Sequence, residues 1–333
     1  MKKKQLLRVA LGLVLGGMVA SVPAFAADDW PSRVITLTVP FGPGSGTDIQ
    51  ARIIASKVSE ILGKFVVIEN RGGAGGSTAV MRVAHAAPDG YQMIIGAVDT
   101  FAQSQYLFDP PPANTLTDFE PVALVTDQPL VLLARTTLPV SNVKEFVAYL
   151  NKNQENVKFG SAGIGAAPYL ACAMITKAAD AKATHVPYRA AAPALLDMVA
   201  GEIDYYCPLA VSAVPFVSNN SVKLLAVLTA DRTPLFPDLK TAKEQGIDVT
   251  DGYYWNAFFM PKGTPPEIVK KMSEAISKAV DDPNVKARLS ELASTVVAPE
   301  RRTPEYLRQY LADEVKKWAK IMKENAVPQQ NSR

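Results

Sequence analysis

The 333-residue chain has very few of the side chains that catalyse reactions or bind metals. It contains two cysteines and two histidines. We interpret both histidines as structural, because His85 lies in a helix pattern and His185 in a strand pattern. A metal centre draws on several such side chains, and a nucleophile needs a base beside it. The sequence therefore predicts no metal and no cofactor, and it gives little support for an enzyme.

The short motifs of nucleotide-binding proteins and serine hydrolases are also missing. Thr47 stands where a GxGxxG motif starting at Gly42 would need its third glycine, and neither GK[ST] nor GxSxG occurs. Most carboxylates are scattered over polar faces, apart from three near expected loops or strand ends: Asp48, Asp99 and Asp204. An exported α/β enzyme stays open as an alternative, although no catalytic pair supports it.

Excess positive charge is confined to the amino-terminal residues. The chain has 35 Lys and Arg against 32 Asp and Glu. Residues 1–26 hold four of the basic residues and no acidic one, so the remaining residues carry a net charge of −1. We expect no strongly basic surface and no nucleic-acid partner.

Residues 1–26 have the order of an export signal. Four basic residues within the first eight precede an apolar run, Val9–Ala20, that is short for a membrane span. Ala24-Phe25-Ala26 then fits the small-x-small cleavage pattern. We expect cleavage after Ala26, with a retained membrane anchor as the alternative. The remaining chain is long enough for two domains.

The two cysteines, Cys172 and Cys207, are a candidate disulfide, because exported proteins fold in an oxidising compartment. Two buried thiols are the alternative. A bond between them would close a loop of 35 residues and stabilise the fold by about 3–4 kcal/mol.

Strand and helix patterns alternate along the chain. In the first hundred residues, helix patterns separate three strand patterns: Val34–Pro40, Phe65–Glu69 and Gln92–Gly96. This alternation predicts a parallel sheet covered on both faces. A second alternation runs from 141 to 206. Between them a strand pattern breaks at Thr126–Pro129, where we expect the chain to pass from one lobe to the next. A last helix from Thr303 carries an apolar stripe that we expect to pack onto the first lobe.

Two glycine-rich loops each lie between a strand pattern and a helix pattern. The first, 42–48, reads GPGSGTD, and the second, 160–165, reads GSAGIG. Such a loop presents backbone N–H groups and a helix amino terminus, which attract anions, carboxylates included. The two loops lie over a hundred residues apart, so we expect two lobes that close on one small acid.

Motifs in order along the chain resemble those of one known family. They include Trp30-Pro31-Ser32-Arg33, Val39-Pro40-Phe41-Gly42-Pro43-Gly44, Glu69-Asn70-Arg71, Ala87-Pro88-Asp89-Gly90-Tyr91, Asp118-Phe119-Glu120-Pro121-Val122, Gly160-Ser161-Ala162-Gly163, His185-Val186-Pro187-Tyr188-Arg189, Gly201-Glu202-Ile203-Asp204 and Lys262-Gly263-Thr264-Pro265-Pro266. Each motif alone is weak, but the ordered set covers essentially the whole mature chain. It resembles the Bug-type periplasmic solute-binding proteins, the substrate-binding components of tripartite tricarboxylate transporters.

The resemblance implies a two-lobed α/β fold of the periplasmic binding protein kind, a type II-like Venus flytrap. Each lobe would be a mostly parallel sheet flanked by helices. The expected parts are the signal at 1–26, a first lobe of 27–125 plus 252–333, and a second lobe of 126–251. The resemblance further implies a periplasmic monomer that captures a small carboxylate, performs no chemistry on it and delivers it to membrane permease subunits. A ligand-presenting sensor for a two-component kinase is the alternative with the same fold.

The resemblance also implies ligand contacts from loops of both lobes. The matching positions are Phe41, Gly44, Thr47, Asp48, Asp99 and Thr100 in the first lobe, and Ser161, Ala162, Gly163, Ala166, Tyr188, Arg189, Tyr206 and Pro208 in the second. Hydroxyl groups such as those of Thr47, Thr100 and Ser161 can donate hydrogen bonds. Arg189 would grip a carboxylate through two bonds, or form a structural ion pair instead.

Three positions depart from the commonest pattern of the family. The stretch Val98-Asp99-Thr100-Phe101 replaces a polar one, Ala166 replaces a serine and Pro208 an aspartate. Asp99 would repel a second ligand carboxylate and accept from a hydroxyl or amine instead. Four aromatic residues could line the pocket: Phe41, Phe101, Tyr188 and Tyr206. Such a lining suggests an aromatic or semi-aromatic monocarboxylate as ligand; the alternative is that these residues lie in the core or on the surface.

Overall fold

A computed structural model describes residues 30–164, 166–188, 190–324, 327 and 329–331. The expected export signal and Arg189 lie outside the described residues. Residues 31–333 form one unit by their contacts. No helix in the part of the chain that the structure describes is long and apolar enough to span a membrane.

The first sheet has six strands in the order β12-β5-β11-β3-β1-β2. Their bounds are β1 (Ile35–Val39), β2 (Val66–Asn70), β3 (Gln92–Ala97), β5 (Phe119–Pro129), β11 (Tyr253–Pro261) and β12 (Thr295–Val296). The helices of this part of the chain are α1 (Gly46–Leu62), α2 (Ser77–Ala84), α3 (Ser104–Leu107), α8 (Pro266–Asp281), α9 (Pro283–Glu291) and α10 (Pro304–Glu324). Three short turns join them: η2 (Ala74–Gly76), the π-helical η3 (Val98–Gln103) and η6 (Pro299–Arg302). A two-stranded ladder pairs β4 (Phe108–Asp109) with β13 (Gln330–Asn331).

The second sheet has five strands in the order β10-β6-β9-β7-β8. Their bounds are β6 (Val131–Arg135), β7 (Lys158–Ser161), β8 (Thr184–Pro187), β9 (Tyr205–Tyr206) and β10 (Val222–Val227). The helices between these strands are α4 (Val143–Asn153), α5 (Ala167–Ala178), α6 (Ala191–Ala200) and α7 (Ala210–Ser218). The short turn η4 (Gln154–Asn156) follows α4, and η5 (Lys243–Gln245) follows β10.

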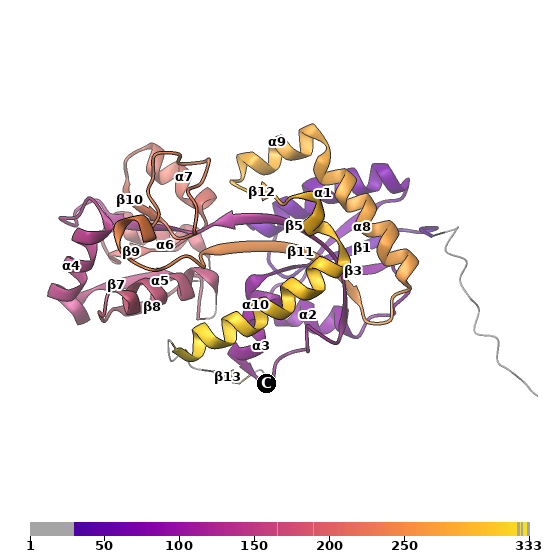
Figure 1. The fold of residues 1–333 in the computed structure, drawn as a ribbon, viewed down its shortest axis with the longest axis horizontal. Coiled ribbons are helices and arrows are strands. Elements are labelled where there is room, and N and C mark those ends of the chain that lie inside the picture. Colours follow the sequence, from indigo (N-terminus) through magenta and orange to yellow (C-terminus); the bar gives the residue numbers. More distant parts are fainter. Residues whose placement is uncertain (1–29, 165, 189, 325–326, 328, 332–333) are drawn as a thin grey trace, which may run out of the picture. The chain divides into compact units, whose positions relative to one another are not determined.

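The α/β fold with two sheets is confirmed, but each sheet is mixed rather than mostly parallel. β1 is parallel to β2 and β3, and β7 is parallel to β8 and β9. β11 is antiparallel to β3 and β5, and β6 is antiparallel to β9 and β10. The chain leaves the first sheet along β5 and returns to it along β11, so these two strands run in opposite directions (Figure 1).

The expected break at Thr126–Pro129 is wrong. β5 continues through these residues, because they pair with Tyr253–Asn256 of β11, and Thr126 and Asp127 pair with β12 as well. The chain turns into β6 only after Leu130, whose N–H donates to the carbonyl of Gly252 at 2.8 Å and whose carbonyl accepts from the N–H of Leu228 at 2.9 Å. Leu130 alone therefore connects β5 of the first sheet to β6 of the second. The lobe boundaries given above stay a prediction.

Gly252 lies where these connecting segments approach most closely. A Cβ atom at this position would lie 2.6 Å from both the carbonyl oxygen and the Cβ of Leu228. We expect Gly252→Ala to lower the free energy of unfolding by about 1–3 kcal/mol, because the backbone must move apart. Denaturant titration measures this, with Gly46→Ala as the control since no atom lies within 4 Å of that added Cβ. Equal stability of the two variants would contradict the close approach.

The apolar stripe of α10 packs into the core, as its spacing predicts. Leu307, Leu311, Trp318 and Met322 are buried in one cluster with residues of β5 and β11. The indole N–H of Trp255 in β11 donates to the Glu314 carboxylate at 2.8 Å. Helix α10 is thereby fixed to the strands that connect the sheets.

A disulfide joins Cys172 in α5 to Cys207, which follows β9. The two Cα atoms are 5.5 Å apart, and both side chains are fully buried. The bond ties the helix that follows the second glycine loop to the strand layer of the second sheet.

Candidate ligand-binding site

The first glycine loop follows the carboxyl end of β1 and leads into α1. Ser45 caps the helix, with its hydroxyl oxygen accepting from the N–H of Asp48 at 3.2 Å. The Asp48 carboxylate accepts in turn from the N–H of Gly44 and from Asn70, each at 2.8 Å, and pairs with Arg52. These bonds lie within the first-sheet part of the chain, so they fix the shape of the loop.

Electrostatics keep Asp48 ionised in this role. Burial alone would raise the pKa of its carboxyl, but hydrogen bonds from Arg52, the Gly44 N–H and Asn70 outweigh burial and hold the pKa below its usual value. The carboxylate oxygens are engaged with these partners. A direct contact of Asp48 with a ligand stays a prediction.

The glycines of the first loop face open space. An added Cβ at Gly42, Gly44 or Gly46 would meet no heavy atom within 4 Å. Gly44 has φ of +80°, a left-handed conformation that favours glycine. Phe41 is half-buried, and its carbonyl accepts from Asn70 at 3.0 Å. The loop therefore leaves the amino terminus of α1 accessible to a ligand.

Thr100 lies just beyond the carboxyl end of β3 and is fully buried. Its hydroxyl donates to the carbonyl of Ala97 at 3.2 Å and accepts from the Ala97 N–H at 2.9 Å. Its methyl group packs so closely on Gly76 that a Cβ there would lie 2.6 Å away. The Thr100 hydroxyl is thus bonded within η3, and donation to a ligand stays a prediction.

Asp99 meets Tyr254 beside the first loop. The Tyr254 hydroxyl lies 3.3 Å from both carboxylate oxygens of Asp99. Thr47 lies near Tyr254 and donates from its hydroxyl to Asn256 of the same strand at 3.4 Å. Burial raises the pKa of Asp99 to about 7, although hydrogen bonds from the Thr100 N–H and Tyr254 oppose the rise. Tyr254 is absent from the sequence-based site, because its contact with Asp99 spans 155 residues.

The second glycine loop follows β7 and leads into α5. The Ser161 hydroxyl accepts from the Gly163 N–H at 3.0 Å and closes a tight turn. Gly163 has φ of +113°, and no atom lies within 4 Å of an added Cβ. Ala162 is exposed, and Ala166 is the half-buried cap residue of α5. The loop resembles the first in presenting open backbone at a helix amino terminus.

His185 has a role that the sequence does not reveal. Its Nε2 lies 2.7 Å from the Ser161 hydroxyl oxygen, and its ring packs against Tyr169 and Phe159. Burial lowers the pKa of His185, which favours the neutral ring. No carboxylate among the described residues pairs with this histidine. It orients the Ser161 hydroxyl and so supports the shape of the second loop. His185 lies in β8, which is parallel to β7, so the strand-helix-strand pattern of the sequence is the signal that could have placed it beside this loop.

The remaining second-sheet candidates differ in exposure. Tyr188 is half-buried and donates from its hydroxyl to Asp197 at 2.8 Å. Pro208 is buried, and its carbonyl accepts from the Val131 N–H. Tyr206 is fully buried in the core of the second sheet and presents no surface to a ligand in this conformation.

The expected aromatic-lined pocket does not form from the four residues named for it. Phe101 is fully buried and stacks on Phe259 with ring centroids 3.9 Å apart. Tyr206 is likewise in a core. Both face inward because their strands and turns place them among apolar neighbours. Only Phe41 and Tyr188 keep partly accessible surface, so the aromatic-acid hypothesis loses this support.

The candidate residues form two groups, one on each sheet. Asp99 and Tyr254 are joined on the first sheet, with Thr47 nearby. Ser161 is bonded to Gly163 and His185 on the second. No hydrogen bond or ion pair links the groups among the described residues.

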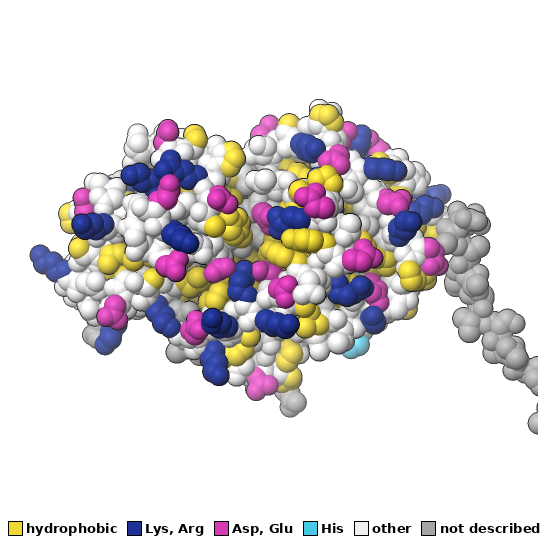
Figure 2. Space-filling view, viewed as in Figure 1, with side chains coloured by type: hydrophobic (Ala, Val, Ile, Leu, Met, Phe, Trp, Pro, Cys, Tyr) yellow, Lys and Arg dark blue, Asp and Glu magenta, His cyan; other side chains and the backbone are white. Residues whose placement is uncertain are grey.

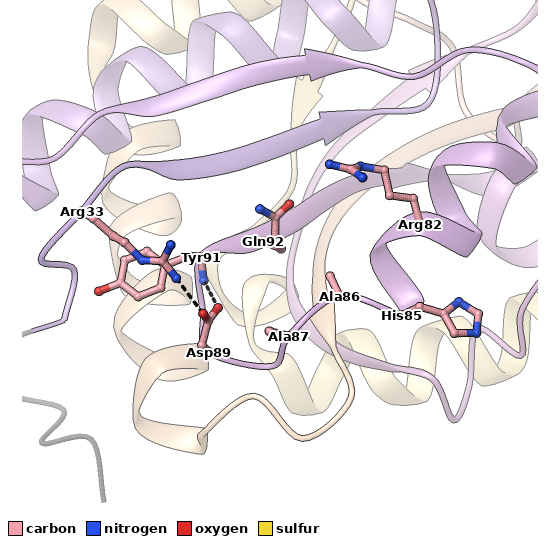
Figure 3. Close-up of a pocket in the computed structure, with 8 residues that line it drawn as sticks. All are labelled: Arg33, Arg82, His85, Ala86, Ala87, Asp89, Tyr91 and Gln92. Atoms are coloured by element: carbon pink, nitrogen blue, oxygen red, sulfur yellow. Dashed lines mark hydrogen bonds and ion pairs between the residues drawn. The ribbon is translucent and has the colours of Figure 1, made fainter. Parts of the chain in front are cut away.

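A pocket of about 360 Å³ lies elsewhere, at the amino-terminal ends of β1 and β3. Figure 3 shows the Arg33 side chain over the ring of Tyr91 and bonded to Asp89; the guanidinium lies 4.1 Å from the ring centroid. The glycine loop and Asp99 follow the carboxyl ends of the same strands. This pocket is therefore separate from the candidate site, and its two arginines are already paired, Arg33 with Asp89 and Arg82 with Glu69.

Charged side chains of both signs are interspersed over the face shown in Figure 2. Several charged side chains of the protein are paired, as Glu120 is with Lys262 and Arg308, and Arg232 with Glu244. This face carries no extended stripe of one sign of the kind that nucleic-acid binding uses.

Comparisons with known proteins agree with the fold. Residues 50–327 match the family described as the tripartite tricarboxylate transporter family receptor. A UPF0065 protein from the TAR-I ttuE-ttuC' intergenic region of Agrobacterium vitis is 35% identical over 316 residues, covering 94% of this chain and 90% of that protein.

Two solved structures are similar over nearly their whole length. MatC from Rhodopseudomonas palustris, with bound malate, is 37% identical with a TM-score of 0.80, covering 88% of this chain and 99% of MatC. The periplasmic binding protein BugD is 33% identical with a TM-score of 0.81, and the match covers 90% of this chain and 100% of BugD. The family resemblance seen in the sequence motifs is thus confirmed: the chain belongs to the tripartite tricarboxylate transporter receptor family.

Proposed function

We propose that this protein is a periplasmic solute-binding protein that captures a small organic carboxylate between its two glycine loops. It delivers the ligand to the permease subunits of a tripartite tricarboxylate-type transporter and performs no chemistry on it. Its export depends on the signal at 1–26, cleaved after Ala26.

The observation that carries this proposal is the matched pair of open loops. Each follows the carboxyl end of a parallel strand, β1 or β7, and leads into a helix amino terminus, α1 or α5. A helix amino terminus favours an anion by about 0.3–1 kcal/mol, and by up to about 2 kcal/mol when partly buried. Two termini acting on one carboxylate would hold it without any cationic side chain.

The connection between the sheets supports closure around a ligand. The chain crosses between them near Leu130, Leu228 and Gly252, which bond to one another through their backbones. Such short crossings act as hinges. A ligand that contacts both loops stabilises the closed form over the open form by its additional contacts.

Transport is favoured over the other functions considered. Family membership and the likeness to MatC, solved with malate, support a carboxylate receptor. Although Ser161 and His185 are in contact, the serine hydroxyl is bonded within its own loop. That arrangement favours a structural role over an exported enzyme.

Native mass spectrometry of protein gently purified from periplasmic extract tests the proposal. We expect a chain that begins at Ala27 and carries one small organic acid, which denaturation releases unchanged. The stripped protein should bind the same acid in calorimetry, and a micromolar Kd would correspond to about −8 kcal/mol. A chemically altered product would indicate an enzyme, and a failure of the stripped protein to bind any carboxylate would contradict the proposal.

A further inference from the structure

Asp99 and Tyr254 are brought together by the register of the first sheet. β1 and β3 are parallel neighbours, so the first loop and Asp99 leave the sheet at the same edge. Asn256 of β11 lies opposite Ala97 of β3. The ladder ends at this pair, and the Tyr254 hydroxyl, from two residues earlier in β11, meets the Asp99 carboxylate just beyond the end of β3. The sheet itself therefore places this carboxylate beside the amino terminus of α1.

The Asp99 carboxylate lacks a strong partner on one side. The Thr100 N–H donates to it at 2.8 Å. The contacts with the Tyr254 hydroxyl, at 3.3 Å, are longer than the roughly 2.5–3.0 Å usual for O–H···O bonds. No cation among the described residues forms an ion pair with Asp99, whereas Asp48 on the same edge has Arg52. A partly buried carboxylate without a cation is costly to keep ionised.

The geometry brings a bound ligand within reach of this carboxylate. The Tyr254 hydroxyl contacts Asp99, and Tyr254 lies near Thr47, the second residue of α1. Asp99 is therefore roughly two polar contacts of about 3 Å each from the first turn of α1. A ligand carboxylate held by the first N–H groups of α1 therefore places its adjacent carbon, and any substituent there, close to Asp99.

Resting on the proposed function, we infer that Asp99 and Tyr254 recognise an ammonium group that the ligand carries beside its carboxylate. The receptor then takes amino acids or similar amine-bearing acids in preference to the unsubstituted acids. An ammonium group supplies three donors and the missing positive charge, and its bonds to a carboxylate are among the strong ones. A second ligand carboxylate at this position would be repelled.

The surroundings of Asp99 predict how binding depends on pH. The groups that face it are Tyr254 from β11 and the Thr100 N–H of its own turn, and Thr47 from α1 lies beside Tyr254. Helix α10 also packs against η3, but its Lys317 pairs with Glu314 and with Asp251. Burial raises the pKa of Asp99 to about 7. Binding of an ammonium needs the ionised form, so affinity for an amine-bearing acid should rise as pH increases from 6 to 8. Affinity for an unsubstituted acid should fall over the same range.

Calorimetry with matched acids tests the inference. Three carbon skeletons are compared, each with hydrogen, hydroxyl or amine on the carbon beside the carboxylate: succinate, malate and aspartate; propionate, lactate and alanine; phenylpropionate, phenyllactate and phenylalanine. Within the skeleton that binds best at pH 7.5, we expect the amine to bind at least tenfold more tightly than the unsubstituted acid. Tighter binding of the hydroxy acid, or equal binding of all three, would overturn the ammonium assignment.

The variant Asp99→Asn keeps the size of the side chain and removes its charge. We expect it to lose at least tenfold in affinity for the amine-bearing acid and to bind the unsubstituted one at least as tightly, because the charge that repels its carboxylate is gone. Asp89→Asn, in the separate pocket at the other end of β3, is the control and should bind as the unaltered protein does. An amine preference that persists in Asp99→Asn would refute the role of Asp99.

Two further results separate this inference from the proposed function. If Asp99→Asn does not fold, the opposite pH trends of the amine-bearing and unsubstituted acids in the unaltered protein decide the inference. If an unsubstituted acid binds with micromolar affinity and its amine does not, the inference fails while carboxylate capture stands. If none of the nine acids, nor the acid found by native mass spectrometry, binds at all, both fail.

Discussion

Replacing both Cys172 and Cys207 by alanine lowers the free energy of unfolding by about 3–4 kcal/mol. The disulfide closes a loop of 35 residues, and the chain-entropy estimate for a loop of that length gives this value. Both positions are fully buried, so loss of packing adds to the effect. Urea titration of the two proteins measures it through the midpoint at unchanged slope.

The unaltered protein in reducing buffer is the matched control for this prediction. Reduction removes the bond but keeps both sulfur atoms, so it isolates the effect of the link from that of packing. A loss below about 1 kcal/mol in both experiments would show that the bond is absent or does not constrain the unfolded chain. The bond also anchors α5, so we expect ligand affinity to fall together with stability.

Ala162→Asp weakens binding of the carboxylate ligand about 5- to 30-fold. The residue is exposed in the second glycine loop, and its neighbour Gly163 has open space on its Cβ side. A negative charge several ångströms from a bound carboxylate costs about 1–2 kcal/mol in a partly solvated site. Gly163 is a poorer position for this experiment, since its φ of +113° makes any side chain strained. Calorimetry at low salt measures the change.

Ala162→Asn is the control for charge, because it has nearly the same shape and is neutral. It should bind within about threefold of the unaltered protein. Raising the salt concentration should partly restore binding to Ala162→Asp, because ions screen the added charge. Unchanged affinity in a folded Ala162→Asp protein would exclude the second loop from the ligand site.

The sequence predicts local features of this protein well. Glycine-rich segments between a strand pattern and a helix pattern locate both loops, because residues without side chains leave the backbone N–H groups uncovered at a helix amino terminus. The apolar spacing of the last helix likewise predicts that Leu307, Leu311 and Trp318 are buried, because a helix with one apolar face packs that face against the core. These features depend on neighbouring residues alone.

Features that depend on distant pairing are not predicted. Thr126–Pro129 looks like a break, but β11 and β12 recruit these residues into β5. Tyr254 belongs beside Asp99 only because of the register between β11 and β3. Phe101 directly follows the expected site residues Asp99 and Thr100, yet the turn carries its ring into the core against Phe259. Pairing between strands far apart in sequence leaves no local pattern.

A crystal structure of the complex with the acid found by native mass spectrometry tests the central claim most directly. The account predicts one ligand carboxylate whose oxygens lie within about 3.2 Å of backbone nitrogens from both loops, 42–48 and 161–166. A ligand bound to one sheet alone, or in the pocket beside Arg33 and Asp89, would contradict it.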